Sequence, residues 1–300
     1  MNRALAGLLF LNLVVPVLAA PSFEEAMALY DDKQYAAARE IAEREAKTGN
    51  VRAMVMLGLI YQKGQGVAAS INQAVDWFAR AADKNDVNAE YALAQIYLDG
   101  ALGKTDNERG QYWLEKAARQ GKPEAEHRMG LLAAGNGGEE PDWAQAVEWF
   151  RKAADQSYAD SEYNLGVLYS QGKGVEQDLS RAAEWFAKAA VQGNPDAALE
   201  YGVMVFRGDG VRKDEKTGAE WLLISAKRGN PVAQNRVAHL YVAGRGVEAD
   251  PAEAVKWHLL AKQGGRSDVS LDEFAAGLAP VMREEGEARA RAFTPEASGP

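Results

Sequence analysis

Closely spaced glycines beside a lysine are what a phosphate-binding loop needs, and the segment YSQGKGVEQD (Tyr169 to Asp178) contains them. In such a loop the glycines let backbone N–H groups converge on one anion at the start of a helix. A phosphate loop occurs once in a domain, whereas related segments begin here at Tyr61, Val205 and Tyr241. The glycine pair therefore indicates a repeated structural element rather than a nucleotide site.

A serine nucleophile activated by a lysine is a second chemistry to consider. Ser170 and Lys173 have the Ser-x-x-Lys spacing of penicillin-recognising enzymes, in which both residues lie on one helix a turn apart. Here Gly172 falls inside the string, at an expected turn between helices. The equivalent serine position of the other segments holds Gln, Leu, Ala, Phe and Val. We therefore expect no catalytic residue in this segment.

The sequence gives little support for a metal site or for a pair of catalytic carboxylates. No two of the histidines, His127, His239 and His258, have the i, i+4 spacing of metal ligands on a helix. The chain has no cysteine, which excludes thiolate sites and disulfides. Adjacent carboxylates such as Glu139 and Glu140 diverge by about 100° around a helix and would not face one substrate. We expect no metal, no cofactor and no enzymatic activity.

The overall charge bears on the class of partner. The chain has 34 Lys and Arg against 43 Asp and Glu, which gives a formal net charge of -9. Nucleic-acid binding proteins need a basic stripe, so a nucleic-acid partner is not expected. The composition, 47% hydrophobic and 26% charged, is that of a globular protein.

The first 19 residues have the pattern of a secretory signal peptide. An arginine precedes an apolar stretch from Leu5 to Leu18, and small residues follow. We predict cleavage after Ala19, hence a periplasmic or secreted protein with no stable membrane insertion. A retained membrane anchor is the alternative, although Asn12 and Pro16 make the stretch marginal for a bilayer.

The elements that must position all these residues belong to a repeat of 36 residues. Tryptophans mark this interval at Trp77, Trp113, Trp149, Trp185, Trp221 and Trp257. A period between about 20 and 50 residues is typical of stacked supersecondary units, each of which buries its apolar face against its neighbours. The sequence therefore predicts a repeat array.

Each unit is predicted to contain two helices. In the unit from Ser161, the first helix places Leu165 and Leu168 on one face, and the glycine pair ends it. The second helix begins at a capping residue followed three positions later by Gln or Glu, as at Ser70, Asp142, Asp250 and, after the last unit, Ser270.

Two expectations about packing follow from residue types that recur at equivalent positions of successive repeats. The tryptophans are expected to fill the space between units, so Trp149→Ala is predicted to cost roughly 3 to 5 kcal/mol. A glycine inside a helix, as at Gly166, is unfavourable by about 1 kcal/mol relative to alanine. Its recurrence as Gly or Ala predicts that two helix backbones touch there.

The predicted organisation has ten segments. They are a signal peptide (1–19), an N-terminal capping helix pair (22–52), repeats at 53–88, 89–124, 125–160, 161–196, 197–232 and 233–268, C-terminal capping helices (269–293) and a disordered tail (294–300).

The segment SEYNLGVLYSQGKGVEQDLSRAAEWFAKAAVQG (Ser161 to Gly193) resembles the Sel1-like repeat, a relative of the tetratricopeptide repeat. The likeness covers the chain from Ala53 to Asp268. The third unit departs most, because its segment LLAAGNGGEEPD has alanine in place of tyrosine and a disturbed glycine spacing. We therefore expect a locally irregular loop there.

The resemblance implies an all-α fold, a right-handed α-solenoid of stacked helix-turn-helix units. It also implies an adaptor for other proteins, in bacteria often in envelope systems, without chemistry of its own. Some exported relatives that are rich in cysteine are described as penicillin-binding or weakly β-lactamase-like. Binding or hydrolysis of cell-wall fragments or β-lactams is therefore the alternative, which the absence of cysteine weakens.

By analogy with the tetratricopeptide superhelix, the first helix of each unit lines a concave groove. One position of this helix lies two residues before Leu165 in the unit from Ser161, and its side chain is expected to point into the groove. In the six repeats this position holds Val55, Tyr91, His127, Tyr163, Leu199 and Asn235. Arg207 and His239, at neighbouring positions of the first helices, are expected to add polar contacts. We predict a protein or peptide partner in this groove. The alternative is that the column is a partly buried helix face.

Overall fold

The computed structural model describes residues 22–138 and 140–296. The predicted signal peptide, residues 1–19, and residues 297–300 of the predicted tail lie outside the described residues. Within the described ranges the secondary structure is helical, with no strand. The prediction of an all-α fold is confirmed.

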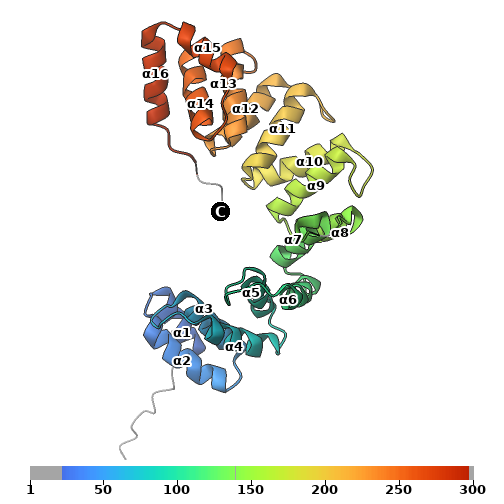
Figure 1. Ribbon diagram of the computed structural model, residues 1–300, viewed down its shortest axis with the longest axis vertical. Coiled ribbons are helices and arrows are strands. Elements are labelled where there is room, and N and C mark those ends of the chain that lie inside the picture. The colour runs from blue at the N-terminus through green and yellow to red at the C-terminus, as the bar shows by residue number, and fades with distance from the viewer. Residues whose placement is uncertain (1–21, 139, 297–300) are drawn as a thin grey trace, which may run out of the picture. The chain divides into compact units, whose positions relative to one another are not determined.

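The chain divides into two units, residues 1–105 and 106–300 (Figure 1). The first unit contains α1 (Phe23–Asp31), α2 (Tyr35–Lys47), α3 (Val51–Lys63), α4 (Ile71–Ala82) and α5 (Val87–Leu98). The second contains α6 (Asn107–Arg119), α7 (Pro123–Leu131), a π-helical turn (Leu132–Asn136), α8 (Trp143–Asp155), α9 (Ala159–Gln171), α10 (Leu179–Val191), α11 (Pro195–Arg207), α12 (Glu215–Lys227), α13 (Pro231–Ala243), α14 (Pro251–Gln263), α15 (Val269–Gly277) and α16 (Pro280–Arg291).

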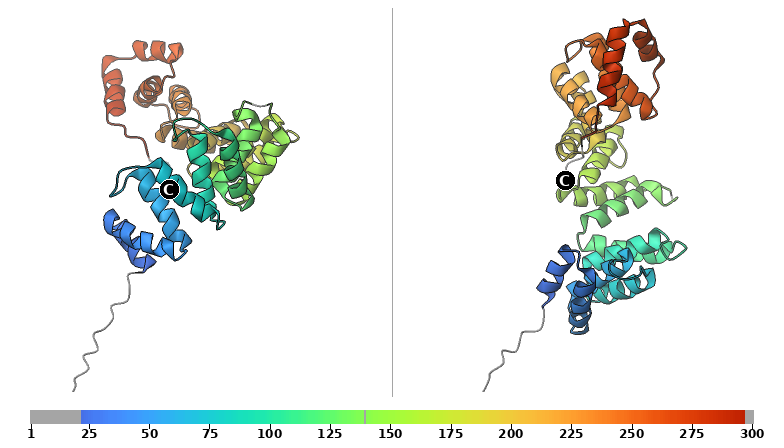
Figure 2. Two further views of the ribbon diagram at one scale, coloured as in Figure 1. Left: turned by 60° about the horizontal axis from the view of Figure 1, so that its bottom comes forward. Right: turned by 90° about the vertical axis from the view of Figure 1, so that its left-hand side faces the viewer.

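Each helix packs mainly on its neighbours in the sequence. In the first unit the contacts run from α1 through α5, and in the second from α6 through α14. At the C-terminus α16 lies beside α14, as the red and orange helices of Figure 2 show. Contacts between sequence neighbours are the mark of a repeat solenoid, because each unit buries its apolar face on the next one.

The helix starts follow the capping residues. Ser70, Asp142 and Asp250 each accept a hydrogen bond from the backbone N–H three residues later, which confirms three predicted starts. The prediction for Ser270 is wrong, because Asp268 caps α15 and Ser270 lies inside the first turn. Asp268 also provides the side-chain oxygen for the N–H of Ser270, so it is the better placed acceptor.

The tryptophan column lies at the edge of the core rather than at its centre. Trp77, Trp113, Trp149, Trp185 and Trp221 are half-buried, and Trp257 is fully buried. In several repeats a cation three residues later covers the exposed side of the ring. Lys188 Nζ, for example, lies 3.8 Å from the ring centroid of Trp185. Trp185 packs against the cluster of the preceding helices α8 and α9, and Trp221 against the cluster of α9 to α11. The prediction that the tryptophans lie between units is therefore confirmed for these two and for Trp257, although only Trp257 is fully buried.

In three repeats the phenylalanine after the tryptophan occupies the centre of the helix pair. Phe150 is 2% exposed, and its ring lies so close to Gly130 of α7 that a Cβ there would overlap it. The same relation holds for Phe78 with Gly58 and for Phe186 with Gly166. The helical glycine thus makes room for a ring in these repeats. The predicted approach of two backbones is found at Gly202, which faces the carbonyl of Gly218.

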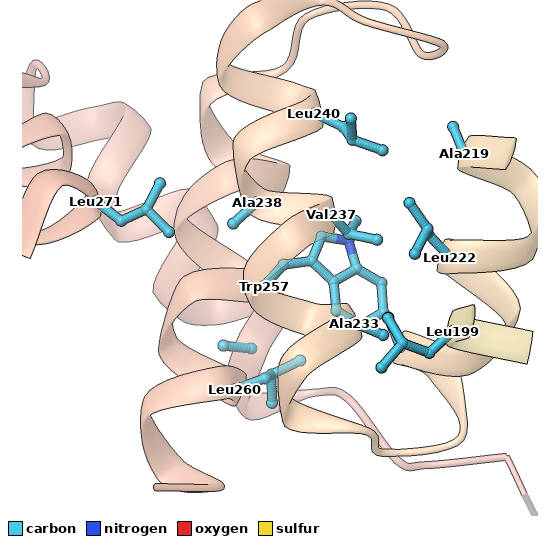
Figure 3. Close-up of a cluster of buried hydrophobic side chains, with 12 residues drawn as sticks. Leu199, Ala219, Leu222, Ala233, Val237, Ala238, Leu240, Trp257, Leu260 and Leu271 are labelled. Carbon is cyan, nitrogen blue, oxygen red and sulfur yellow. The ribbon is translucent and has the colours of Figure 1, made fainter. Parts of the chain in front are cut away.

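The C-terminal core explains why Trp257 differs from the other tryptophans. Its indole, 1% exposed, lies in a cluster with Leu199, Leu222 and Val237 (Figure 3). Phe293, in the segment after α16, packs on the same ring with 5.4 Å between the centroids. The C-terminal segment therefore covers the face of the last repeat that would otherwise be exposed.

The predicted irregularity in the third unit is confirmed. Helix α7 runs into a π-helical turn, Leu132–Asn136, in which Gly135 has a φ of 91°. Four of the other five repeats have tyrosine at the position of Ala133. The small alanine therefore leaves this turn without the large side chain that Tyr169 packs into the cluster of α9 to α11.

The described tail is partly held by the second unit. The backbone N–H of Glu296 donates to the carbonyl of Lys227 at 2.9 Å, and Pro295 lies beside Gly229. Residues 295 and 296 of the predicted tail therefore contact the end of α12 and the glycine that follows it.

A buried polar column accompanies the apolar core. Glu126 and Glu162 are buried and accept hydrogen bonds from Gln156 and Gln192, the residues that directly follow α8 and α10. Gln234 occupies the same position in the last repeat. Burial raises the pKa of both glutamates because it penalises the charged carboxylate, and the glutamine hydrogen bonds only partly offset this.

Replacing Glu162 by glutamine should remove a pH dependence of stability. The raised pKa means that Glu162 favours folding most below its unfolded pKa of about 4.3, and that this contribution is lost as pH rises through the folded pKa. Glutamine does not titrate and can still accept from Gln192. Urea denaturation should therefore give Glu162→Gln a midpoint at least as high as the parent at pH 7, with the difference shrinking toward pH 4.

The exposed Glu184 on α10 provides the control. Glu184→Gln should leave the midpoint nearly unchanged at both pH values. A Glu162→Gln protein that is clearly less stable than the parent at pH 7 would contradict the argument.

Candidate protein-binding site

Helices α11 and α13, the first helices of two successive repeats in the second unit, line a cavity of about 560 Å³. Helix α11 contributes Val203, Phe206 and Arg207, and α13 contributes Val232, Asn235, Arg236, His239 and Leu240. Leu222 of α12 and the loop residues Lys213, Arg245 and Arg266 complete the lining.

The two helices share a register because they start and stop at the same signals. Asn194 caps α11 and Asn230 caps α13, each followed by proline at the first helical position. Asn230 Nδ2 also donates to Asp196 Oδ1 at 2.7 Å, which ties the two helix starts together. Residues at equivalent positions of α11 and α13 therefore face the same side.

Asp268 connects α13 to the C-terminal cap. Its Oδ2 accepts from Asn235 Nδ2 at 3.0 Å and lies 2.9 Å from His239 Nε2, while its Oδ1 caps α15. The hydrogen bonds from Asn235, His239 and Ser270 hold the pKa of Asp268 well below its usual range. Asp268 thus stays charged and fixes the side chains of Asn235 and His239 at the cavity.

Two of the loop cations share one carboxylate. Arg245 Nη2 lies 2.6 Å and Lys213 Nζ 2.9 Å from Glu215 Oε1. These two hydrogen bonds lower the pKa of Glu215 to about 2. The Arg245 guanidinium also lies over the Phe206 ring, 4.8 Å from its centroid. Both cations are therefore held in place by groups of this site.

The other three arginines are not matched in this way. Arg207, Arg236 and Arg266 form no ion pair with the residues that the structure describes. Burial lowers the pKa of Arg236, and the positive charges of Arg207 and Arg266 lower it further, whereas Glu200 raises it. The Arg236 guanidinium thus lies near those of Arg207 and Arg266, and Glu200 is the carboxylate that acts on it.

The structure brings three of the predicted site residues together. Arg207, Asn235 and His239 all line this cavity. Leu199, by contrast, is 7% exposed and packs in the hydrophobic cluster around Trp257, so its side chain belongs to the core (Figure 3). Asn235 is also buried, and it reaches the cavity only beside its hydrogen bond to Asp268.

The other predicted residues lie elsewhere. Tyr91 is half-buried in the first unit. In the second unit, Tyr163 packs on Phe186 with 5.7 Å between ring centroids, and His127 Nδ1 lies 2.9 Å from Ser161 Oγ. Burial lowers the pKa of His127. This column is thus largely a packing face, and a binding role for these three residues stays a prediction.

Sequence reasoning missed most of the charge in the cavity. It followed one position of the repeat and did not consider Arg236, which directly follows Asn235. Arg245 stands between the two glycines of its loop, where the preceding repeats carry other residue types. A search for cations that recur near one end of the array would have found both, together with Arg266.

The described residues contain no group of three or more His, Asp or Glu side chains that could hold a metal ion. None of their helices combines the length and the apolar composition needed to span a bilayer.

Comparison with known proteins identifies the repeat. A family model described as Sel1 repeat matches six consecutive segments, residues 51–86, 87–122, 123–158, 159–194, 195–230 and 231–265. The chain belongs to the Sel1 repeat family. Proteins of this family are generally scaffolds for protein–protein interaction.

Two solved structures support the assignment. A Sel1 repeat protein from Oxalobacter formigenes is 30% identical, with 81% of this chain and 100% of that chain covered and a TM-score of 0.72. A protective antigen of uropathogenic Escherichia coli with an SLR fold is 24% identical, with a TM-score of 0.78. The match covers 91% of this chain but 61% of the antigen, and shows the fold alone. None of the curated proteins compared with the chain matches it.

The glycine pair of the Sel1 repeat has a structural role. Gly172 ends α9 in the left-handed conformation with a φ of 66°, and a Cβ at Gly174 would overlap the carbonyl of Trp143, the first residue of α8. The second glycine makes the same approach to a preceding helix at Gly66 with Ala36, Gly210 with Leu179, and Gly246 with Glu215. Lys173 Nζ lies over the Trp143 ring, 4.6 Å from its centroid. The loop thus joins successive repeats.

Ser170 takes part in a local contact as well. Its Oγ donates to the carbonyl of Val167 at 2.8 Å. Helix α9 ends at Gln171, so Lys173 stands beyond the helix rather than one helical turn after the serine. Nothing in this arrangement favours a serine nucleophile activated by the lysine.

Proposed function

We propose that this Sel1 repeat protein is an exported, non-catalytic scaffold of the bacterial envelope that binds a protein or peptide on its first-helix face. The observation that carries the proposal is the cavity between α11 and α13, where Arg207, Asn235 and His239 converge. First helices line this cavity, and the family generally mediates protein–protein interaction.

The chemistry of the cavity suits a polypeptide. Apolar side chains such as Val203 and Leu240 lie next to guanidinium and imidazole donors. Protein interfaces combine an apolar centre with hydrogen-bonding groups around it, and arginine is enriched among the residues that dominate their affinity. The polar donors here are N–H groups, which suit carbonyl and carboxylate acceptors.

Export rests on the N-terminal sequence. The apolar stretch from Leu5 to Leu18, followed by small residues, is that of a cleaved signal peptide. The periplasm or the exterior is therefore the compartment in which we place the partner.

Photo-crosslinking in the source cells tests this function. A photoreactive phenylalanine analogue in place of His239, whose side chain is exposed at the cavity, should form a discrete adduct with a protein of the envelope fraction. The mature chain recovered from the same cells should begin at Ala20, as its N-terminal sequence will show.

Tyr112 on α6 serves as the matched control, since it is an aromatic residue, 55% exposed, outside the cavity. The same analogue there should give no such adduct. Equal adducts from both positions, or none from His239, would refute the assigned face. An intact Met1 would refute export.

A further inference from the structure

The cavity between α11 and α13 carries a charge opposite to that of the whole chain. Its lining holds five cations, Lys213 and four arginines, while the carboxylates that act on it are Glu200, Glu215 and Asp268. The chain as a whole has a net charge of -9. A local surplus of positive charge in an acidic protein concentrates anionic ligands at that place.

The surplus is located on particular side chains. Glu215 holds Lys213 and Arg245, and Asp268 is fixed by Asn235 and His239. The guanidinium groups of Arg207, Arg236 and Arg266 remain, and Glu200 is the carboxylate near Arg207 and Arg236. Like charges close together are unfavourable unless an anion separates them, and guanidinium groups bind carboxylates in a bidentate geometry.

The floor of the cavity indicates a peptide rather than a small inorganic anion. Phe206, Val203 and Leu240 present apolar surface directly beside the arginines. A volume of about 560 Å³ is that of a site for several side chains, far more than one phosphate occupies. An acidic residue flanked by an apolar one would match both surfaces.

We propose that this cavity binds an acidic segment of a partner protein, with a carboxylate on Arg207, Arg236 and Arg266 and an adjoining apolar side chain on Phe206 and Leu240. This inference deepens the proposed function and rests on it, because it names the chemistry of the partner for the same face. Charge complementarity selects this occupant.

Selection from a random peptide library displayed on phage tests the chemistry without knowledge of the partner. The mature chain should enrich peptides in which Asp or Glu adjoins Leu, Ile or Phe. The selected peptide, labelled with fluorescein, is then titrated with the mature chain by fluorescence anisotropy, and added salt should weaken its binding.

Charge variants connect the binding to the cavity. Arg236→Glu should lower the affinity for the selected peptide by about tenfold or more, because a repulsive contact replaces an attractive one. Lys216→Glu makes the same charge change on the exposed surface of α12, outside the cavity, and should change the affinity less than about twofold. The peptide with lysine in place of its acidic residue should bind Arg236→Glu better than it binds the parent. Thermal melts of each variant verify the fold, and Arg207→Ala serves as a second variant if Arg236→Glu is unfolded.

The outcomes separate the inference from the proposed function. Three results would overturn the acidic-segment inference. The library could show no enrichment of acidic residues, or Arg236→Glu and Lys216→Glu could weaken peptide binding equally. The third result is that inorganic phosphate or heparin competes as strongly as the unlabelled peptide. If His239 nevertheless forms its adduct in cells, the scaffold function stands. Acidic peptides that bind the cavity without any adduct in cells would refute the scaffold function, whereas the preference of the cavity for acidic peptides would stand.

Discussion

Replacing Phe150 by alanine should lower the free energy of unfolding by about 3 to 5 kcal/mol. Its ring is almost fully buried between α7 and α8 and lies directly on Gly130, which has no side chain to move into the space. The helix backbones are held apart by their other contacts, so the cavity left by the ring cannot close fully. Urea denaturation followed by circular dichroism measures the loss.

Trp149 is the matched control because it precedes Phe150 on the same helix. Its ring is half-buried, and Lys152 Nζ lies 4.0 Å from the ring centroid on the outer side. Trp149→Ala should therefore cost only about 1 to 2 kcal/mol, less than the sequence predicts. A larger loss for Trp149→Ala than for Phe150→Ala would show that the indoles, and not the phenylalanines, hold the repeats together.

Replacing Gly174 by alanine should lower the free energy of unfolding by about 2 to 5 kcal/mol. Its φ of 71° is unfavourable for a residue with a Cβ by about 1 to 2 kcal/mol. The added methyl group would also overlap the carbonyl of Trp143 and the amide of Ala144 at the start of α8. Backbone atoms cannot turn away as a side chain does, so the preceding repeat must shift, which adds about 1 to 3 kcal/mol.

Gly172 separates the two contributions. Its φ of 66° is similar, but the nearest atom to an added Cβ is the Cβ of Gln177 at 3.2 Å. Gly172→Ala should therefore lose only the conformational part, about 1 to 2 kcal/mol, in the same urea experiment. Equal losses for the two variants would mean that the contact between the loop and α8 does not stabilise the stack.

The repeat and its helices are determined by local sequence. The cap of α8 at Asp142 and the left-handed end of α9 at Gly172 each depend on a residue and its nearest neighbours, so spacing alone locates them. Even the irregular turn after α7 is visible as a break in the glycine spacing. The start of α15 is the exception, because Ser270 and Asp268 both fit a cap and only the backbone geometry chooses Asp268.

Burial and the candidate binding surface depend on contacts between residues far apart in the chain. A recurring Trp-Phe pair does not reveal which ring faces the core, because that depends on how closely Gly130 and its equivalents let the helices approach. The cavity joins Arg207, Arg236 and Arg266 from three separate segments, and no spacing within one repeat places them together. The amino-acid sequence by itself determined the periodic helices and their ends. Only the tertiary structure decided which residues of one column are buried, as Leu199 is, and which cations converge, because both depend on how successive repeats pack.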